Sequence, residues 1–309
     1  MTTLAYFEGD FVPMEQANVS IACNTLHYGT GCFGGIRAYW NETQEQLYLF
    51  RVRDHYKRLL NSAKLLFCEI DYTAEQLVKI TTELLAREGW RQNVYIRPLI
   101  YKDDGIFRVW LHDSTDKIAI FSQSVGSYIK AEGISVGVSS WRRVDDTAMP
   151  ARGKVNGTYV NSALAKSDAM KSGFDEALVL NQDGHISEAS AANVMIVREG
   201  VVITPPVTAN ILEGITRRTV IQLLRDDLGL EVVERNIDRS ELYLANEAFF
   251  CGTGVQIAAI SSVDHRPLGD GATGPITRQL ADLYARVVTG EEASYMDWLT
   301  PVPVQEEVV

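Results

Sequence analysis

The stretch ARGKVNGTY, residues 151–159, places Lys154 in a polar turn between two glycines. A backbone that carries glycines can approach a ligand closely, because glycine has no Cβ. Apolar residues at helical spacing resume directly afterwards and predict a helix over residues 158–172, which Gly173 ends. Most lysines are solvated surface charges, and composition alone favours that interpretation. In this turn, however, a lysine can form a Schiff base, since an amine attacks a carbonyl once it has lost its proton.

On both sides of this stretch, runs of strand-like and helix-like periodicity alternate. Asp54 is predicted to cap the first helix, and Thr73 with Gln76 forms a capping-box pattern ahead of the second, which Gly89 ends. The tail from Pro301 has no periodic apolar face and is expected not to pack. The predicted strands cover residues 36–40, 47–50, 94–101, 118–122 and 134–139, and the predicted helices cover residues 54–67, 73–89, 158–172, 216–228 and 276–288.

The length of 309 residues favours two domains, and residues 126–133 (GSYIKAEG) form the best candidate linker between them. The sequence therefore predicts an α/β or α+β chain, with an N-terminal domain over residues 1–125 and a C-terminal domain over residues 134–309. A chain of this length buries a sizeable core without disulfides or metals.

The charge balance and the cysteines exclude several classes of partner and site. The net charge is 29 − 40 = −11, which argues against a nucleic acid or an anionic membrane, since both attract clustered lysine and arginine. No apolar run approaches the roughly 20 residues that cross a bilayer. The four cysteines show no CxxC spacing and no nearby histidine, so no metal site is expected. Scattered cysteines, and an N-terminus without a signal-like apolar stretch, indicate reduced thiols in the cytoplasm.

Residues 29–34, GTGCFG, match the dinucleotide fingerprint GxGxxG, and Asp54 lies about 20 residues further on, as that fingerprint asks. The fingerprint also requires a strand before the glycines and a helix after them. Here residues 23–28 are not an apolar strand, and residues 36–40 have the pattern of a strand. A nicotinamide-binding module, which predicts a colourless protein, therefore ranks below a Schiff-base enzyme.

Further groups can surround a ligand of the lysine. Glu188 sits among small residues, where a confined carboxylate can keep a heteroaromatic nitrogen protonated; otherwise it is a surface glutamate at a strand end. LEGITR, residues 212–217, precedes an apolar helix, so its amides can face an anion. CGTG, residues 251–254, suits a nest of amides, and Arg58 offers a cation. Each alone is more simply a cap, a turn or a solvated arginine, but together they supply a carboxylate and three anion donors.

With these motifs the chain resembles the fold-type IV pyridoxal-phosphate enzymes, and most closely the branched-chain amino acid aminotransferases. The resemblance runs from about Tyr6 to Leu299. It implies a small N-terminal α/β domain and a larger C-terminal pseudo-barrel domain joined by a short linker, with pyridoxal 5′-phosphate as the cofactor. The motifs that carry it are LHYGT at residues 26–30, FxGIR at 33–37, YIRPL at 95–99, Lys154 with Tyr159, Glu188 with Asn193, LxGITR at 212–217 and Gly252-Thr253.

The resemblance also implies a role for each matching residue. Lys154 corresponds to the Schiff-base lysine and proton shuttle, Glu188 to the carboxylate on the pyridine nitrogen, and Tyr159 to a phenol near the ring oxygen. Tyr28 corresponds to a residue lent to the neighbouring subunit's site, which implies a homodimer or a higher homo-oligomer. The other cofactor-binding positions are Arg58, Leu212, Gly214, Ile215, Thr216 and Thr253, and the substrate-binding positions are Tyr28, Phe33, Arg97, Tyr128, Thr253 and Gly254.

The implied reaction is transamination of the branched-chain L-amino acids leucine, isoleucine and valine with 2-oxoglutarate. Its two half-reactions share one site, which must accept a branched apolar side chain and also the carboxylate of glutamate. Arg97 is the expected partner of that carboxylate, because guanidinium groups bind carboxylates through paired hydrogen bonds. The expected partners are therefore small molecules, namely these amino acids, glutamate and their 2-oxo acids.

Three departures from the family's pattern lie in the half that shapes the substrate pocket. Gly34 stands where a glutamate is common, and Val125 where a bulky aromatic is common. Residues 102–110 lack the usual glycine-rich loop and add Arg108. These departures keep open an alternative of the same fold, a transaminase that accepts D-amino acids or (R)-amines or has a broadened substrate range. Arg97 favours the L-amino acid reaction, and it also disfavours a lyase of this fold that acts on aminodeoxychorismate.

Overall fold

The computed structural model describes residues 3–124, 126 and 133–303, and these residues form two compact units. The N-terminal unit contains Met1–Gly126, Gly153–Gly157 and Arg286–Val309, and the C-terminal unit contains Ser127–Arg152 and Thr158–Ala285. Each unit has its own sheet and its own core, and each is described separately below.

The predicted domain limits, residues 1–125 and 134–309, stay predictions. Residues 127–132 of the predicted linker, Tyr128 among them, lie outside the described residues, as does Val125. The compact units differ from the predicted division at two places, because the segment that carries Lys154 and the last residues of the chain both belong to the N-terminal unit. Both segments pair with N-terminal strands through their main chain.

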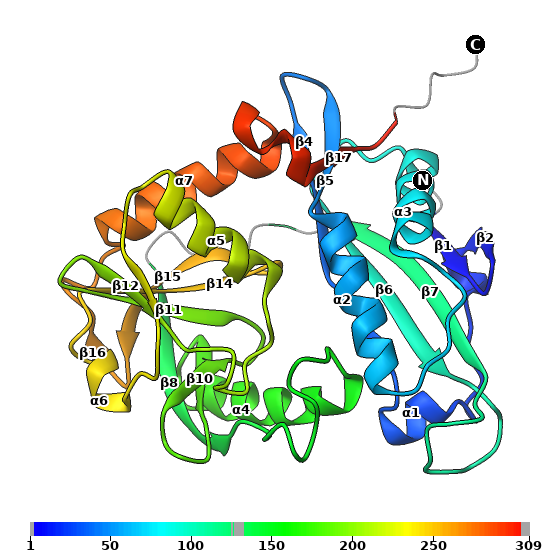
Figure 1. Cartoon of the computed structure of the whole chain (residues 1–309), viewed down its shortest axis with the longest axis horizontal. Coiled ribbons are helices and arrows are strands. Elements are labelled where there is room, and N and C mark those ends of the chain that lie inside the picture. Colours follow the sequence, from blue (N-terminus) through cyan, green and yellow to red (C-terminus); the bar gives the residue numbers. More distant parts are fainter. Residues whose placement is uncertain (1–2, 125, 127–132, 304–309) are drawn as a thin grey trace. The chain divides into compact units, whose positions relative to one another are not determined.

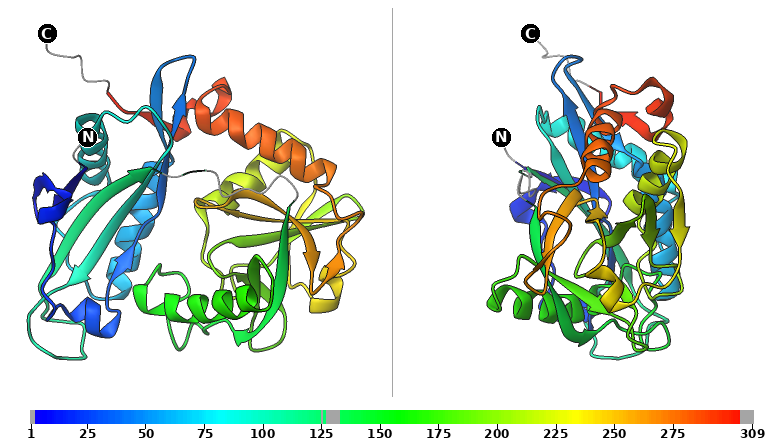
Figure 2. Two further views of the ribbon diagram at one scale, coloured as in Figure 1. Left: turned by 180° about the vertical axis from the view of Figure 1, so that it is seen from behind. Right: turned by 90° about the vertical axis from the view of Figure 1, so that its left-hand side faces the viewer.

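The described part of the N-terminal unit is built on an eight-stranded antiparallel sheet of order β17-β5-β4-β6-β7-β1-β2, in which β3 also pairs with β6. Figures 1 and 2 show α2 and α3 on one face of this sheet. The strands are β1 (Leu4–Phe7), β2 (Asp10–Pro13), β3 (Cys32–Phe33), β4 (Ile36–Asn41), β5 (Gln46–Phe50), β6 (Val94–Lys102), β7 (Asp116–Ser124) and β17 (Leu299–Pro301), and the helices are α1 (Asn24–Tyr28), α2 (Val52–Leu65) and α3 (Ala74–Glu88) with 3-10 turns at Met14–Gln16 and Ala293–Trp298.

The helix starts show which local signals decided the fold. The capping box ahead of α3 is confirmed: Gln76 N donates to Thr73 Oγ1 at 3.2 Å, and Thr73 N donates to Gln76 Oε1 at 2.7 Å. The prediction that Asp54 caps α2 was wrong, because the helix already begins after Arg51. Asp54 instead lies in the first turn, where a carboxylate favours the positive end of the helix dipole, and it forms an ion pair with Arg51 at 3.1 Å.

The prediction that the chain from Pro301 does not pack was wrong for its first residues. Strand β17 pairs with β5, with Pro301 opposite Tyr48. Val302 is buried, and its N–H donates to Leu47 O at 2.9 Å. The end strand of a sheet tolerates proline, which has no N–H to donate, so this short segment closes the edge of β5 despite its two prolines.

The C-terminal unit is built on a curled sheet of order β10-β9-β8-β15-β14-β11-β12-β13, with β16 paired to β15, nine strands in the described residues. Where β10 turns into β11, Ala189 N donates to Ala192 O at 2.8 Å, so the two strands lie together and the sheet forms a pseudo-barrel. Buried apolar side chains from many of the strands, such as Val136, Val194 and Phe250, form its core. The chain therefore has the expected α+β class.

In this unit, α4 packs against β8 and β9, and α5 packs against β14. Strand β8 runs parallel to β9 and β15, and β13 runs parallel to β12. The strands are β8 (Ile134–Arg142), β9 (Glu176–Leu180), β10 (Ile186–Ala189), β11 (Asn193–Arg198), β12 (Val201–Thr204), β13 (Val232–Glu234), β14 (Glu247–Gly252), β15 (Gln256–Val263) and β16 (Arg266–Pro267). The helices are α4 (Tyr159–Lys171), α5 (Ile215–Asp226), α6 (Arg239–Leu242) and α7 (Pro275–Thr289), whose last residues belong to the N-terminal unit. A 3-10 turn at Asn156–Thr158 contains the boundary between the N-terminal unit's lysine segment and this unit.

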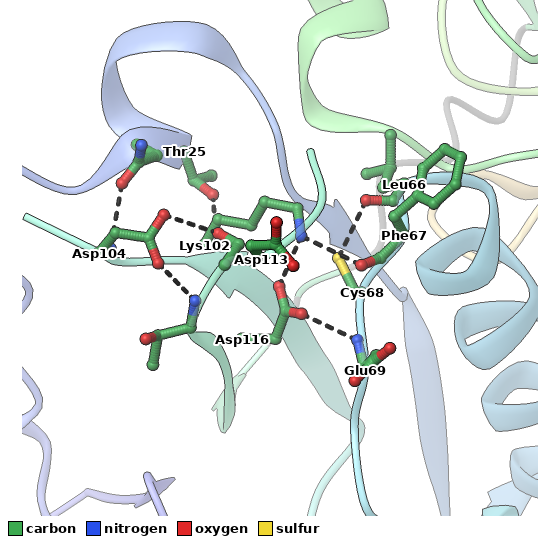
Figure 3. A network of polar contacts seen from close by, with 12 residues as sticks. Thr25, Leu66, Phe67, Cys68, Glu69, Lys102, Asp104, Asp113 and Asp116 are labelled. Atoms are coloured by element: carbon green, nitrogen blue, oxygen red, sulfur yellow. Dashed lines mark hydrogen bonds and ion pairs between the residues drawn. The ribbon is translucent and has the colours of Figure 1, made fainter. Parts of the chain in front are cut away.

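Charged side chains fix the base of the β6–β7 connection (Figure 3). Lys102 and Asp116 lie opposite each other in register, with Nζ and Oδ1 2.8 Å apart and both side chains buried. Asp116 also accepts a hydrogen bond from Glu69 N at 2.8 Å, and Lys102 Nζ donates to Phe67 O at 3.4 Å. A buried ion pair is tolerated when further hydrogen bonds satisfy it, as here.

Asp104 organises the loop that follows. Its carboxylate pairs with Arg108 at 2.8 Å and accepts from the Ser114 hydroxyl at 2.8 Å, while its N–H donates to Asn24 Oδ1 on α1 at 3.0 Å. The loop in which the sequence departs from the family's pattern is therefore tied both to itself and to α1.

Candidate active site

The lysine segment is held in the N-terminal unit by main-chain pairing. Residues 153–157 run antiparallel to residues 29–33, with Val155 bridged to Cys32. Because both ends of the segment are bonded, the main chain of Lys154 has a defined position. The hydrogen bonds run from Phe33 N to Lys154 O at 3.0 Å, from Asn156 N to Gly31 O at 2.8 Å, and from Gly157 N to Gly29 O at 3.1 Å.

This pairing explains the glycines of the GxGxxG match. A Cβ on Gly29 would lie 2.8 Å from the Cα of Gly157, and a Cβ on Gly31 would lie 2.9 Å from Ile100 O. The described residues after them form strands β3 and β4 rather than a helix, so a pyrophosphate would have no helix N-terminus to meet. The glycines allow the lysine segment to approach, and the match to a nucleotide motif is accidental.

Lys154 and Arg97, both predicted for the site, lie over the ring of a third predicted residue, Phe33. Lys154 Nζ lies 5.0 Å from the centroid of the Phe33 ring, and Arg97 Cζ lies 4.6 Å from the same centroid. Arg97 also lies over Tyr95, whose hydroxyl accepts from Nη2 at 3.4 Å. Strands β3 and β6 bring Phe33 and Arg97 together. The cluster combines an amine, a guanidinium and an apolar ring, and its positive charge suits a carboxylate ligand.

Ser62, which the sequence did not single out, connects the lysine segment to α2. Its buried hydroxyl accepts from Lys154 N at 3.1 Å and donates to Arg58 O at 2.9 Å. Arg58 lies one helical turn before Ser62, so the same face of α2 carries both residues. In the sequence, the spacing of four residues between Arg58 and Ser62 was the local signal for this contact, and such a spacing is common in any amphipathic helix.

Tyr28 ends α1 immediately before Gly29 and is 40% exposed. Its ring packs against His27, with centroids 6.0 Å apart. An exposed tyrosine next to the anchoring glycine is compatible with a role toward a neighbouring chain.

In the C-terminal unit, the carboxylate of Glu188 is buried in β10 with only 4% of the residue exposed. Its Oε2 accepts from Asn193 Nδ2 at 2.9 Å and from Leu212 N at 3.1 Å. Its Oε1 pairs with Arg143 Nη2 at 2.8 Å. A buried charge is costly unless it is paired and hydrogen-bonded, and these donors meet that need. Glu188 is therefore not the surface glutamate of the alternative interpretation, and Arg143 is a neighbour that the sequence did not reveal.

Helix α5 begins next to this carboxylate. Gly214 is its extended N-cap residue, and no side chain caps the first amides, which helix geometry leaves without intrahelical partners. A Cβ on Gly214 would lie 2.0 Å from Asn193 Oδ1, and Asn193 Nδ2 also donates to Leu212 O at 3.0 Å. Asn193 thus joins the Glu188 carboxylate to the loop at residues 212–214. Ile215 and Thr216 are buried at the helix start.

The turn after β14 lies at the same end of the barrel. Asn193 of β11 pairs in register with Cys251, and Thr253 and Gly254 follow in the tight turn between β14 and β15. Burial raises the pKa of the Cys251 thiol to about 12, with the Arg217 charge lowering it and the Glu188 charge raising it. Cys251 is therefore an unreactive thiol, which leaves the polar chemistry of this region to its neighbours.

Tyr159 and Tyr128 were also predicted for the site. Tyr159 is the first residue of α4, five residues after the lysine. Tyr128 lies outside the described residues. Among the residues that the structure does describe, no group of histidine, cysteine and acidic side chains could hold a metal ion, and no helix is both long and apolar enough to cross a membrane.

The sequence and the fold of the chain are similar to those of known proteins. The family described as amino-transferase class IV matches residues 31–263. A probable branched-chain-amino-acid aminotransferase of Aquifex aeolicus is 50% identical over 299 residues, 96% of either chain.

Solved structures agree with this relationship. The branched-chain aminotransferase of Thermoproteus uzoniensis with norvaline has a TM-score of 0.94 and 43% identity, covering 98% of this chain and 100% of that chain. A T.th. branched-chain amino acid aminotransferase complexed with N-(5′-phosphopyridoxyl)-L-glutamate has a TM-score of 0.93 and 38% identity, covering 98% and 99%. The chain therefore belongs to the class IV aminotransferase family, among its branched-chain-amino-acid aminotransferases, which are pyridoxal-phosphate enzymes.

Proposed function

We propose that this protein transfers the amino group of branched-chain L-amino acids to 2-oxoglutarate, with pyridoxal 5′-phosphate bound through Lys154. The observation that carries the proposal is the shared ring: the amine of Lys154 and the guanidinium of Arg97 both lie over Phe33. An amine suits a carbonyl, a guanidinium suits a carboxylate, and a phenyl face suits an aliphatic side chain. A relative complexed with N-(5′-phosphopyridoxyl)-L-glutamate supports glutamate and 2-oxoglutarate as the second substrate pair.

The donor set fits this cofactor. Glu188, held by donors on both of its oxygens, suits a protonated pyridine nitrogen. The uncapped start of α5 suits a phosphate, and Arg58 and Thr253 would add a cation and a hydroxyl. The proposed cofactor-binding set is Arg58, Lys154, Tyr159, Glu188, Leu212, Gly214, Ile215, Thr216 and Thr253, and the proposed substrate-binding set is Tyr28, Phe33, Arg97, Tyr128, Thr253 and Gly254.

Each proposed role follows from the chemistry of the side chain. When bound, the cofactor supplies an electron sink for the bond that breaks at the substrate's α-carbon. The Lys154 amine, once displaced by the incoming amino group, moves the proton at that carbon. Arg97 orients the substrate carboxylate, and Phe33 excludes water beside the aliphatic side chain.

Covalent labelling tests the assignment of the lysine. Borohydride reduction of the protein with its bound cofactor, followed by peptide mapping, should label Lys154, and a label on another lysine would remove the assignment. Lys154→Arg keeps the charge and should abolish turnover. Lys166→Arg is the matched control, because Lys166 sits on α4 in an ion pair with Glu176 at 2.7 Å, and it should leave turnover unchanged.

The contacts of the altered loop favour L-amino acids over the alternative substrates. Arg108 was one of the departures behind the alternative of a D-amino acid or (R)-amine transaminase. Its guanidinium forms an ion pair with Asp104 at 2.8 Å, so its charge is balanced without a substrate carboxylate. A Cβ on Gly34 would lie 2.6 Å from Pro98 Cγ, so this position stays without a side chain. L-leucine, L-isoleucine and L-valine should therefore react with 2-oxoglutarate faster than D-alanine or (R)-phenylethylamine reacts. The reverse order of rates would establish the alternative.

We also propose that a second copy of this chain covers the apolar surface formed by residues 21–28, which include α1, and the loop at residues 103–115. The two segments are in contact, since the rings of His27 and Phe107 are 4.9 Å apart. A contiguous exposed apolar surface marks an interaction site, and Tyr28 ends the same helix. The exposed fractions are 86% for Ile21, 64% for Leu26, 66% for Phe107, 74% for Val109 and 53% for Trp110.

Light scattering on the purified protein tests this homo-oligomer. Wild type should run as a dimer or a larger closed assembly, and Val109→Asp should shift it toward the monomer. Val160→Asp, on α4, is the control, because Val160 is 66% exposed and lies outside this surface. A monomeric wild type, or an equal shift in both variants, would contradict the proposal.

A cytoplasmic location completes the proposal. Cys23, Cys32, Cys68 and Cys251 are all free thiols in the structure, which suits a reducing compartment. Cell fractionation should find the protein with cytoplasmic markers, and recovery from a membrane or secreted fraction would contradict this location.

A further inference from the structure

Arg143, directly after β8, contacts Glu188 of β10, and both its main chain and its guanidinium are held by hydrogen bonds. It follows β8 directly and is buried, with its N–H bonded to Leu180 O at 2.8 Å. Its Nη2 lies 2.8 Å from Glu188 Oε1, and its Nε donates to Asn210 O at 3.1 Å. A guanidinium held at two of its nitrogens cannot swing away from the carboxylate without breaking both contacts.

The acceptor on the far side of Arg143 is itself held in place. Asn210 has a φ of 55°, in the left-handed region that asparagine tolerates better than most residues. Its Nδ2 donates to Asp145 Oδ2 and to Asn181 Oδ1, each at 3.3 Å. The main-chain carbonyl that receives Arg143 is thus oriented by two further contacts, so the ion pair is supported by a built environment.

Arg143 is a charged group in direct contact with the Glu188 carboxylate. In the described residues packed against the carboxylate, Asn193 on β11 and Leu212 in the following loop donate neutral hydrogen bonds. The Cys251 thiol on β14 is neutral, with a pKa raised to about 12 by burial. Arg217 at the start of α5 is committed to Glu234 at 2.7 Å. Arg143 therefore offsets the burial of the carboxylate through direct contact.

We propose that Arg143 is a positioning residue that keeps the Glu188 carboxylate ionised and correctly oriented. Because Glu188 then holds no proton, the proton between the two groups resides on the cofactor's pyridine nitrogen. This inference rests on the proposed function, in which Glu188 faces that nitrogen. Burial without a countercharge favours a neutral carboxyl. In the absence of Arg143, the proton would reside on Glu188 before the cofactor binds, and the nitrogen would receive only a neutral hydrogen bond.

Proton linkage separates this role from a merely structural one. Pyridoxamine 5′-phosphate is the probe, because it makes no bond to Lys154. Above the pKa of the free probe's pyridine nitrogen, binding to an ionised Glu188 takes up one proton, so Kd should rise about tenfold per pH unit. A Glu188 that already carries the proton takes up none, and Kd then stays flat over the same range.

The experiment measures Kd of pyridoxamine 5′-phosphate by calorimetry from about pH 6 to about pH 9.5, a range of about 3.5 units chosen to include the titration of the probe's pyridine nitrogen. Wild type should show the slope of one proton above the pKa of the free probe's pyridine nitrogen. Arg143→Met and Arg143→Gln should bind about tenfold more weakly at neutral pH and lose the slope, as expected when a hydrogen bond to a charged group is removed. Arg143→Lys should restore the slope. Arg198→Met, which removes an arginine paired with Glu241 at 3.0 Å, is the matched control and should follow wild type.

A double variant completes the test. Adding Arg143→Met to Glu188→Gln should not weaken binding further, because Arg143 acts through that carboxylate. A wild-type slope in Arg143→Gln overturns the inference, and it decides the matter even where Arg143→Met does not fold. If wild type itself fails to bind the probe, it is the proposed function that fails, whereas a binding wild type with unchanged slopes in the variants refutes the role of Arg143 alone.

Discussion

Gly29→Ala tests the contact that positions the lysine segment. Gly29 is the residue directly after α1 and has a φ of 67°, and a Cβ there would lie 2.8 Å from the Cα of Gly157. Gly157 presents main chain, which cannot rotate away as a side chain would. The two paired segments must therefore separate by about 0.6 Å to reach the 3.4 Å of ordinary contact.

The expected loss of stability has two parts. Alanine in place of glycine at a positive φ costs about 1 kcal/mol. Forcing packed groups apart costs a further 1–3 kcal/mol, roughly, and strains the hydrogen bond from Gly157 N to Gly29 O. Gly89→Ala shares only the first part, because Gly89 ends α3 at a φ of 65° with nothing within 4 Å of its Cβ position. We therefore expect a loss of about 3 kcal/mol for Gly29→Ala and about 1 kcal/mol for Gly89→Ala.

Urea unfolding of the two variants beside wild type measures these losses, and steady-state kinetics measures the effect on the site. A displacement of well under 1 Å in the lysine's main chain should lower kcat of Gly29→Ala by about tenfold, because reacting groups tolerate little misplacement. Gly89→Ala should keep the wild-type kcat. Equal stability losses in the two variants, together with unchanged turnover in Gly29→Ala, would refute the reasoning.

Three further perturbations probe other parts of the molecule. Gly214→Ala would place a Cβ 2.0 Å from Asn193 Oδ1; displacing that amide should weaken cofactor binding about tenfold in a fluorescence titration, and an unchanged Kd would contradict it. Ser62→Ala should lower the free energy of unfolding by about 1 kcal/mol in urea, and a neutral result would mean that water replaces the hydroxyl. A hydrogen bond with Arg235 holds the pKa of Glu241 at about 2, below its usual 4.5, so this pair stabilises the fold above pH 4.5 and loses that contribution as the pH falls toward 2. Stability curves of wild type and Glu241→Gln should converge over that interval, and parallel curves would contradict the assignment.

Local features of the fold were predictable because neighbours in the sequence create them. The capping box of Thr73 and Gln76 spans three residues, and the helix after the lysine segment begins within one residue of its predicted start. The hairpin of β4 and β5 followed from two apolar runs around a polar turn. A local signal gave a wrong prediction where a contact distant in sequence decides the structure. The composition from Pro301 predicts a loose tail, but Pro301 belongs to a strand that pairs with the edge of β5.

The arrangement of the site depends on pairings that leave no local periodic trace. Phe33 meets Lys154 across 121 residues of chain, and Arg143 meets Glu188 across 45, so no helical or strand period connects either pair. The contacts of Gly29 and Gly31 are also distant in sequence, since these glycines approach the lysine segment and β6. From the sequence alone, their spacing matched a nucleotide-binding motif. The motifs named the candidate site residues, but they did not reveal Arg143, which forms an ion pair with Glu188.

The sheet of the N-terminal unit includes strands from opposite ends of the chain, and this has a consequence during synthesis. A nascent chain emerges N-terminus first, so β5 stays unpaired on this edge until Leu299–Pro301 has been made, and residues 29–33 stay unpaired until residues 153–157 have been made. An open strand edge is a template for pairing with another chain. Polypeptides truncated before Leu299 should therefore accumulate as aggregates or depend on chaperones, and premature termination would yield no short active form of the enzyme.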